Sequence, residues 1–354
     1  MIAAGGTGGH IYPGIAVAKE ILRRDPSSEV LFVGTSRGLE TKIVPENGFQ
    51  LALIHSAGLK NVGIKGKVKG LMTLPRSFVE ARRSLREFRP TVVVGAGGYV
   101  SGPVLMMAVV MGIPTLVMDS NALPGFTNRR LAKFVDRAAL TFQEALPFFG
   151  KKGTVTGNPV RKEFFEVRPK EHNGPTFVLV FGGSQGARAI NNAMIGALDR
   201  LNGNRESMRV VHQTGEADFE RVRAAYAEHK WETANVRPYI SDMMTEFEKA
   251  DILICRAGAT TCAEIAAAGK AAVMIPLPTA ADDHQRKNAE AMQNAGAARM
   301  IVQDQLSPES LANILTELAN SPKEIDDMEK AARKLAREDA AEATVNIIEE
   351  LARD

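Results

Sequence analysis

Four glycine-rich segments each follow a short apolar run and precede a stretch with helical spacing. These segments are residues 5–10, 95–102, 182–187 and 256–261. A loop of this form at the start of a helix presents backbone N–H groups and the positive end of the helix dipole to an anion. A single such loop is better explained as a tight turn that needs glycine for steric reasons. Four of them, two in each half of the chain, favour an enzyme that binds a diphosphate.

The glycine loops lack the sequence motifs of two common classes of nucleotide-binding enzyme. The pattern G-x-x-x-x-G-K-[ST] does not occur in the sequence, which excludes a P-loop nucleotidase. A nicotinamide enzyme would carry an acid near the end of its second strand to hold the ribose, whereas this run ends Phe32-Val33-Gly34-Thr35. The sequence therefore predicts diphosphate binding without hydride transfer or nucleotide hydrolysis.

The elements that must position these loops alternate along the chain. Short β-branched runs at 30–33, 92–94, 114–118, 177–181, 252–255 and 272–275 are separated by longer helix-like stretches. This alternation predicts an α/β protein with doubly wound parallel sheets. It lapses between residues 151 and 175, which predicts two domains, 1–160 and 161–339. Helical spacing continues from 328 to 351, and a C-terminal helix at 340–354 is a candidate to pack back on the first domain.

The composition is that of a globular protein in a reducing compartment. Hydrophobic residues make up 45% and charged residues 24% of the 354 residues, which excludes a disordered chain. The two cysteines, Cys255 and Cys262, lie in apolar segments and are expected to be free thiols. Residues 1–9 show no signal-peptide pattern, and no apolar run reaches the length of a spanning helix. We therefore expect a cytoplasmic protein.

The positive charge is concentrated in the first half. Residues 1–160 carry 20 Lys and Arg against 10 Asp and Glu, whereas the rest carries 24 against 31. Residues 58–89 mix nine basic side chains with apolar ones, a pattern that indicates contact with an anionic membrane surface. The alternative is a solvated helix face over an ordinary core, and Pro75 is expected to interrupt any long helix here. Nucleic acid is disfavoured because aromatic residues are scarce.

Five motifs together resemble the MurG family of peptidoglycan glycosyltransferases. They lie in family order at residues 5–13, 97–103, 157–161, 182–187 and 264–269. The resemblance implies a GT-B fold and transfer of N-acetylglucosamine from UDP-N-acetylglucosamine to lipid I, which forms lipid II. It further implies inversion at the anomeric carbon, no metal, no cofactor, and a peripheral place on the cytoplasmic face of the membrane. The second domain would hold the donor and the first the acceptor.

The resemblance also implies residue roles on the donor side. Ser184 and Gln185 would meet the diphosphate, Arg161 and backbone groups of Ile240 the uracil, and Glu264 the ribose hydroxyls. The other expected donor-side residues are Ala259, Thr260, Thr261, Cys262 and Ala263 at a helix start, and His284 and Gln285 on sugar hydroxyls. As alternatives, Glu264 is a first-turn acid that complements the helix dipole, Arg161 pairs with Glu163, and His284 is an ordinary surface histidine.

On the acceptor side the resemblance points to two glycine loops and one asparagine. The residues are Thr7, Gly8, Gly9, Gly97, Gly98, Tyr99, Ser101 and Asn121. Attack by a hydroxyl needs a base, and His10 is the first candidate because a helix N-terminus disfavours imidazolium. Closing the turn or binding acceptor phosphate is an equal alternative for His10. Asp119 is the rival base, in a segment that reads Met118-Asp119-Ser120-Asn121 where the family usually has His-Glu-Gln-Asn.

Three other functions fit parts of the pattern. A related GT-B enzyme would use another sugar or lipid, for example a diacylglycerol acceptor. A UDP-N-acetylglucosamine epimerase shares the architecture but needs no lipid, and the basic and apolar segment disfavours it. A non-catalytic nucleotide-sugar binding module would bind the donor without turnover.

Overall fold

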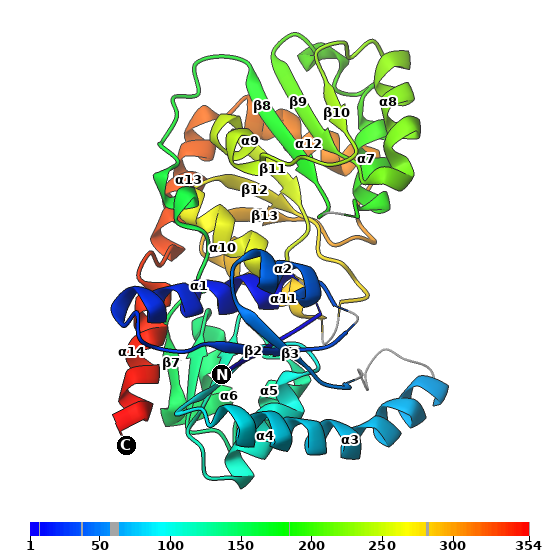
Figure 1. Ribbon diagram of the computed structural model, residues 1–354. Coiled ribbons are helices and arrows are strands. Elements are labelled where there is room, and N and C mark those ends of the chain that lie inside the picture. Colours follow the sequence, from blue (N-terminus) through cyan, green and yellow to red (C-terminus); the bar gives the residue numbers. More distant parts are fainter. Residues whose placement is uncertain (7, 37, 57–63, 184, 281–282, 354) are drawn as a thin grey trace. The chain divides into compact units, whose positions relative to one another are not determined.

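The chain forms two compact α/β units, which we describe separately. The structure, a computed structural model, describes residues 1–354 except 7, 37, 57–63, 184, 281–282 and 354, and no side chain of residues 64–72. The first unit comprises Met1–Val160 and Arg337–Asp354, and the second comprises Arg161–Ala336. Figure 1 shows one parallel sheet flanked by helices in each of them.

The first unit contains a seven-stranded parallel sheet in the order β3-β2-β1-β4-β5-β6-β7. Its strands are β1 (Ile2–Ala4), β2 (Leu31–Gly34), β3 (Gln50–Leu53), β4 (Val93–Gly97), β5 (Thr115–Asp119), β6 (Arg137–Leu140) and β7 (Gly153–Val155). Its helices are α1 (Gly8–Arg24), α2 (Glu40–Glu46), α3 (Ile64–Phe88), α4 (Ser101–Val110), α5 (Phe126–Leu131), α6 (Leu146–Phe149) and α14 (Ala340–Arg353). In register, Ile2 lies between Phe32 and Val94. Apolar clusters cover both faces, which is why these strands are continuous apolar runs.

The second unit contains a six-stranded parallel sheet in the order β10-β9-β8-β11-β12-β13. Its strands are β8 (Thr176–Phe181), β9 (Met208–Gln213), β10 (Asn235–Arg237), β11 (Ile252–Cys255), β12 (Ala271–Met274) and β13 (Ala298–Met300). Its helices are α7 (Arg188–Ala197), α8 (Phe219–Glu228), α9 (Met243–Lys249), α10 (Ala259–Ala268), α11 (His284–Asn294), α12 (Pro308–Ala319) and α13 (Pro322–Leu335). The predicted strand segments and the doubly wound class are confirmed in both units.

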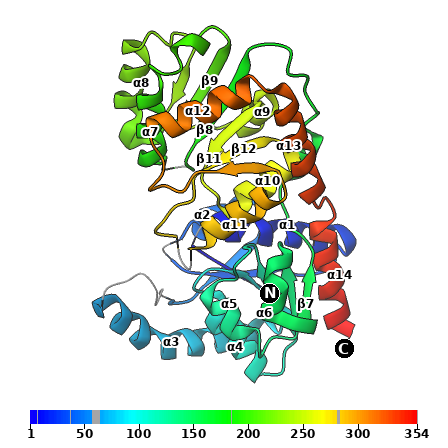
Figure 2. The same ribbon diagram turned by 180° about the vertical axis from the view of Figure 1, so that it is seen from behind.

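The stretch with helical spacing at 328–351 contains the end of one helix and most of a second, C-terminal one. α13 ends at Leu335, Ala336 is extended, and α14 begins at Ala340. α14 belongs to the first unit and packs against α1, as both Figure 1 and Figure 2 show. Arg24 of α1 donates hydrogen bonds to Asn346 at 2.7 Å and to Glu349 at 3.2 Å.

The prediction that Pro75 interrupts the basic segment is wrong. α3 runs from Ile64 to Phe88 with Pro75 inside it. A proline removes only one N–H donor from the helical ladder and need not end a helix whose other residues pack well. Ala81 and Leu85 are buried farther along this helix and join the apolar core of the first unit. Among the described residues, no helix is both long and apolar enough to cross a membrane.

A buried ionic network joins the elements of the second unit at the end of the sheet where its strands begin. Asp251 accepts from Phe177 N at 2.7 Å and lies 2.9 Å from His172 Nδ1. On its other side the His172 ring lies 3.4 Å from Glu329 of α13. Lys270 is 1% exposed, donates to the Ala250 carbonyl at 2.8 Å and lies 3.9 Å from Glu329. The network ties α13 to the strands β8, β11 and β12.

Removing the buried cation of this network should destabilise the second unit. We expect Lys270→Met to lower the free energy of unfolding by about 3 kcal/mol, because Glu329 loses a partner inside the protein. Fluorescence of Trp231, the single tryptophan and a core residue of this unit, would follow its denaturation. Lys330→Met is the matched control, since Lys330 lies exposed on α13 beside Asp326. Equal midpoints for the two variants would contradict the assigned role.

Candidate active site

The sheet topology places the four glycine loops at the two points where strand order reverses. In an open parallel sheet, ligands bind beyond the carboxyl ends of the strands at such a point. In the first unit the reversal lies between β1 and β4, which lead into residues 5–9 and 97–101. In the second it lies between β8 and β11, which lead into residues 182–187 and 256–258.

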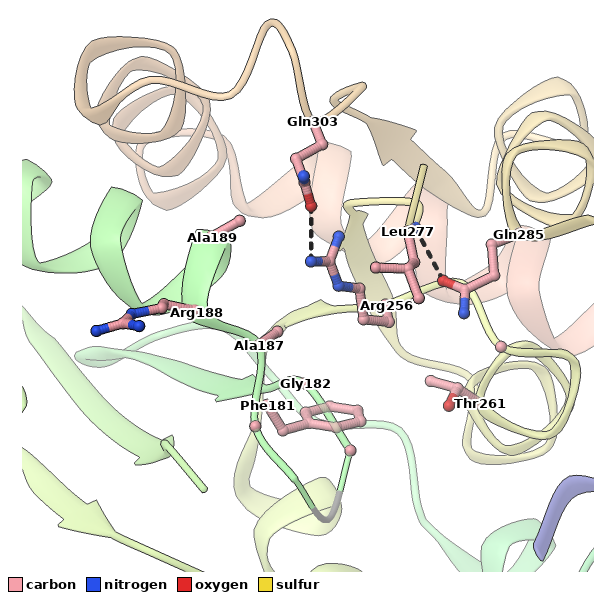
Figure 3. A pocket seen from close by; sticks show the side chains of 13 residues that line it. Phe181, Gly182, Ala187, Arg188, Ala189, Arg256, Thr261, Leu277, Gln285 and Gln303 are labelled. Atoms are coloured by element: carbon pink, nitrogen blue, oxygen red, sulfur yellow. Dashed lines mark hydrogen bonds between the residues drawn. The ribbon is translucent and has the colours of Figure 1, made fainter. Parts of the chain in front are cut away.

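The second unit has a pocket of about 550 Å³ at its reversal point (Figure 3). It is lined by Phe181, Gly182, Gly183, Gly186, Ala187, Arg188, Ala189, Arg256, Gly258, Thr261, Leu277, Gln285 and Gln303. Its described lining contains two arginines and no Asp or Glu. The N-terminus of α7 follows the glycine loop directly. Loop, helix end and arginines together form a site suited to a diphosphate.

Gln213, at the end of β9, fixes the glycine loop of this pocket. Its Nε2 donates to the Gly183 carbonyl at 2.9 Å, and its Oε1 accepts from Ile240 N at 2.7 Å. The backbone N–H of Ile240 therefore already has a hydrogen-bond partner within the protein. Recognition of uracil by Ile240 stays a prediction, and it would use the Ile240 carbonyl. A Cβ at Gly186, whose φ is +73°, would collide with the Thr214 carbonyl. This close approach explains the glycine.

Arg256 is the cation that sequence reasoning did not assign. It follows β11, and its Nη1 donates to the carbonyls of Ile275 and Pro276 at 3.0 and 3.1 Å. Its Nη2 donates to Gln303 Oε1 at 2.7 Å, as Figure 3 shows. Burial lowers the pKa of Arg256, but a guanidinium stays charged. The sequence signal was its place at the head of the fourth glycine segment.

Glu264 and Arg161 form an ion pair in the second unit. The distance from Arg161 Nη2 to Glu264 Oε1 is 3.5 Å, and the guanidinium also lies over the Phe164 ring, 4.8 Å from its centre. Pairing with Glu163 is therefore not what the structure shows. Glu264 lies beyond the first turn of α10, which begins at Ala259, so a first-turn role is also wrong. Burial raises the pKa of Glu264 to about 7 against the opposing charge of Arg161.

The other expected donor-side residues differ in what they offer a ligand. Thr261 and Gln285 line the pocket, and Gln285 Oε1 accepts from Leu277 N at 3.0 Å. Ala259, Ala263 and Thr260 lie in the first two turns of α10, and Thr260 Oγ1 is buried without a hydrogen bond to the described residues. Gln185 is exposed, His284 begins α11, and Ser184 lies outside the described residues.

Cys262 differs from these neighbours because its side chain is only 1% exposed. Its N–H donates to the Gly258 carbonyl at 2.9 Å. The side chain of Cys262 therefore packs in the interior rather than facing a ligand. Cys255 is buried as well, and both cysteines are free, as predicted.

In the first unit, the loops after β1 and β4 interlock around His10. Gly8 and Gly9 begin α1 and His10 is its third residue, while Thr7 lies outside the described residues. Gly97 has a φ of +116°, and a Cβ there would collide with the imidazole of His10. Gly98 has a φ of +82°, and a Cβ there would collide with the Gly5 carbonyl. The imidazole therefore packs directly on the backbone of the second loop.

Ser101 and Tyr99 of the second loop have different environments. The Ser101 hydroxyl is buried, accepts from Gly97 N at 3.0 Å and lies 2.9 Å from the Ala3 carbonyl, to which it can donate. It fixes the loop to β1. Tyr99 is 57% exposed, and its carbonyl accepts from Ser56 Oγ. Of the two side chains, Tyr99 is the one open to an acceptor.

The carboxylate of Asp119 accepts hydrogen bonds from the loop and helix that follow it. It is 4% exposed and accepts from Asn121 N at 3.0 Å, Gly125 N at 3.1 Å and Asn128 Nδ2 at 2.8 Å. Burial raises its pKa despite these hydrogen bonds. The geometry favours a structural role in holding residues 120–125, with Asn121 half-buried at their start. His10 remains the stronger candidate for the base.

The comparisons with known proteins agree with this architecture. Residues 1–140 match the glycosyltransferase family 28 N-terminal domain, and residues 177–344 match its C-terminal domain. With two Rossmann-like sheets, these matches define a glycosyltransferase of the GT-B fold. The fold class predicted from the motifs is confirmed.

Relatives over the whole chain define the family. The UDP-N-acetylglucosamine--N-acetylmuramyl-(pentapeptide) pyrophosphoryl-undecaprenol N-acetylglucosamine transferase of Citrifermentans bemidjiense is 46% identical over 350 residues, 98% of each chain. Acinetobacter baumannii MurG has a crystal structure with a TM-score of 0.82 and 32% identity, covering 99% of this chain and 98% of that one. The chain therefore belongs to the MurG family.

A more distant structural neighbour shares the fold alone. UDP-GlcNAc 2-epimerase from Neisseria meningitidis, solved bound to UDP-GlcNAc, has a TM-score of 0.71 at 13% identity, covering 99% of each chain. Its resemblance explains why the architecture by itself did not separate a transferase from an epimerase.

The pKa of Glu264 should rise when its cation is removed. We expect a carboxyl titration near pH 7 in the wild type and at higher pH in Arg161→Met, because the guanidinium stabilises the ionised form. Carbon-13 NMR of labelled glutamate, assigned with Glu264→Gln, would measure both values. Arg168→Met removes an exposed arginine of the same unit and should leave the titration unchanged. An unchanged titration in Arg161→Met would contradict the ion pair.

Proposed function

We propose that this enzyme transfers N-acetylglucosamine from UDP-N-acetylglucosamine to the muramyl 4-hydroxyl of lipid I, with inversion, and so forms lipid II. Membership of the MurG family carries the proposal. The two reversal points, one with a diphosphate-suited pocket and one with a histidine on a glycine loop, supply the chemistry that this reaction requires.

The second unit would bind the donor and stabilise the departing UDP. As the glycosidic bond breaks, negative charge develops on the diphosphate, and donors already in place lower the barrier because they need not reorganise. Here these donors are the loop at 182–187, the N-terminus of α7 and the Arg256 guanidinium. Glu264 would accept from the ribose hydroxyls, and Gln285 and His284 would bind those of the sugar.

The first unit would supply the acceptor site and the base. The neutral imidazole of His10 takes the proton from the 4-hydroxyl while that oxygen attacks the anomeric carbon. The carbon–oxygen bond to UDP breaks on the opposite face, and the leaving diphosphate keeps the electron pair. The imidazolium then returns its proton to solvent. The contact between His10 and Gly97 holds the ring in one place for this transfer.

We also propose that α3 docks on the cytoplasmic face of the membrane, where a lipid-linked acceptor lies. Arg76, Arg82, Arg83 and Arg86 are exposed on this helix, and Val79 between them is 67% exposed. Exposed arginines around an apolar side chain suit the headgroup layer of an anionic bilayer. The rest of the basic segment, 58–72, lies outside the described side chains.

The transfer itself can be tested with labelled donor and a short-chain lipid I analogue. We expect wild-type product, a kcat lower by about 10² to 10⁴ in His10→Ala, and weaker donor binding in Glu264→Ala. His55→Ala is the control, since His55 is an exposed histidine of the first unit. Product made only with a diacylglycerol acceptor, or release of free sugar, would replace the proposal with one of its rivals.

Membrane docking predicts a dependence on charge in α3. We expect the double change Arg82→Ser and Arg86→Ser to weaken binding to vesicles with anionic phospholipid about thirtyfold, from about 1 kcal/mol per basic residue. Changing Arg200 and Lys230, two exposed cations of the second unit, to Ser should have little effect. Equal vesicle binding of both double variants, measured by sedimentation, would count against this surface.

A further inference from the structure

A buried carboxylate fills the first glycine loop. Glu40 begins α2 and is 0% exposed, and its Oε2 accepts from Gly6 N at 2.9 Å. Its Oε1 accepts from both the N–H and the hydroxyl of Thr35, each at 2.8 Å. The loop is held from the other side as well, because Leu39 N donates to the Gly6 carbonyl at 3.4 Å. Glu40 thus joins the end of β2 to the loop that follows β1.

Glu40 is an internal anion at the place where a ligand phosphate is expected. Burial would raise its pKa, but hydrogen bonds from Thr35 and Gly6 outweigh burial and hold the pKa below its ordinary value. The carboxylate is therefore ionised at neutral pH. It occupies the Gly6 N–H, a donor of the kind that a phosphate-binding loop offers its ligand. The expectation that both halves carry an equivalent phosphate-ready loop is wrong for Gly6.

The two glycine loops are anchored in opposite ways. In the second unit Gln213 donates to the Gly183 carbonyl, so that loop is held through an acceptor. In the first unit Glu40 accepts from Gly6 N, so that loop is held through a donor. In the second unit the internal hydrogen bond is made by a loop carbonyl. In the first unit it is made by a loop N–H, which donates to a carboxylate. This difference indicates a different task for the first loop.

A continuous series of close contacts leads from Glu40 to His10. A Cβ at Gly5 would lie 3.0 Å from Glu40 Oε1 and 3.2 Å from Val100 Cγ1, so the Gly5 backbone is held between them. Gly98 packs on the Gly5 carbonyl, and Gly97 packs on the His10 ring. The steps at Gly97 and Gly98 leave no room for an added methyl group, and the step at Gly5 is in tight contact. Movement of the Gly5–Gly6 backbone would therefore be transmitted to the imidazole.

We propose that Glu40 is a positioning residue for His10: its carboxylate takes the place of a ligand anion in the first glycine loop and fixes the loop that carries the base. The role of His10 as the base rests on the proposed function. The placement of its ring through Glu40 does not. Glutamine at position 40 would have the same size yet present an N–H₂ group to N–H donors, so the loop could not keep its present geometry.

The test compares Glu40→Gln with Glu46→Gln, whose side chain lies exposed on the same helix beside Lys42. We expect kcat for transfer to the lipid I analogue to fall at least tenfold in Glu40→Gln, with KM for UDP-N-acetylglucosamine within twofold of wild type. The acid limb of the kcat/KM profile should also shift, since it follows the titration of His10. Glu46→Gln should match wild type throughout.

A second measurement needs no turnover. The imidazole NMR signals of labelled protein, with the His10 signal assigned from His10→Ala, should show a displaced His10 resonance in Glu40→Gln. The His55 signal, from the first unit, and the His212 signal, from the buried core of the second, should stay in place and show that both units are folded.

Two results would overturn the proposal. One is a kcat within twofold of wild type together with an unmoved His10 signal. The other is a loss of kcat that only parallels a loss of donor affinity and of the His55 and His212 signals. If wild type forms no lipid II analogue, the proposed function fails, and the displacement of the His10 signal still decides whether Glu40 positions the ring.

Discussion

Burial of both faces of each parallel sheet is the constraint on which both candidate sites depend. A sheet covered by helices on both sides can offer ligands only its carboxyl edge, and only where neighbouring loops diverge. Here β1 and β4 in one unit and β8 and β11 in the other create that divergence. Apolar clusters pack around these strands, and a shift of one residue would exchange the side chains of the two buried faces and so disrupt this packing. The glycine loops are therefore fixed by packing that lies far from any ligand.

Although the two sheets share this topology, the two sites differ in the charge of the side chains around them. The pocket of the second unit is lined by Arg188 and Arg256 without a described carboxylate, which suits an anionic donor. The loop of the first unit already contains the carboxylate of Glu40 and ends in a histidine. Two loops of the same sequence type and the same topology thus serve opposite electrostatic purposes. The surrounding side chains, rather than the glycines, decide which purpose each loop serves.

The sequence predicted what is local and periodic, and it missed what depends on contacts between distant residues. Strands such as Phe177–Phe181 and the helix at Arg188–Ala197 follow from apolar runs and glycine punctuation, and the structure has them there. Gln213 and Glu40 carry no local signal, since each acts on a loop far away along the chain, and the contacts of Arg256 with Ile275, Pro276 and Gln303 could not be read from its place in a glycine segment. The prediction for Pro75 was wrong for the converse reason, because the packing of α3 outweighed the local tendency of proline to end a helix. The hydrogen bonds that the Asp119 carboxylate accepts from Gly125 and Asn128 likewise could not be read from the local sequence.

The return of α14 to the first unit has a consequence for how the protein is made. Val345, Ile348 and Leu351 belong to the same apolar cluster as Ile2, Ile15 and Phe32, so β1 and β2 share a core with a helix that follows the second unit in the chain. The second unit, Arg161–Ala336, is one uninterrupted segment and has all its residues before α14 is synthesised. Domains generally fold as units during synthesis. On the ribosome, the N-terminal part therefore stays incompletely covered until α14 has been synthesised, after the whole of the second unit.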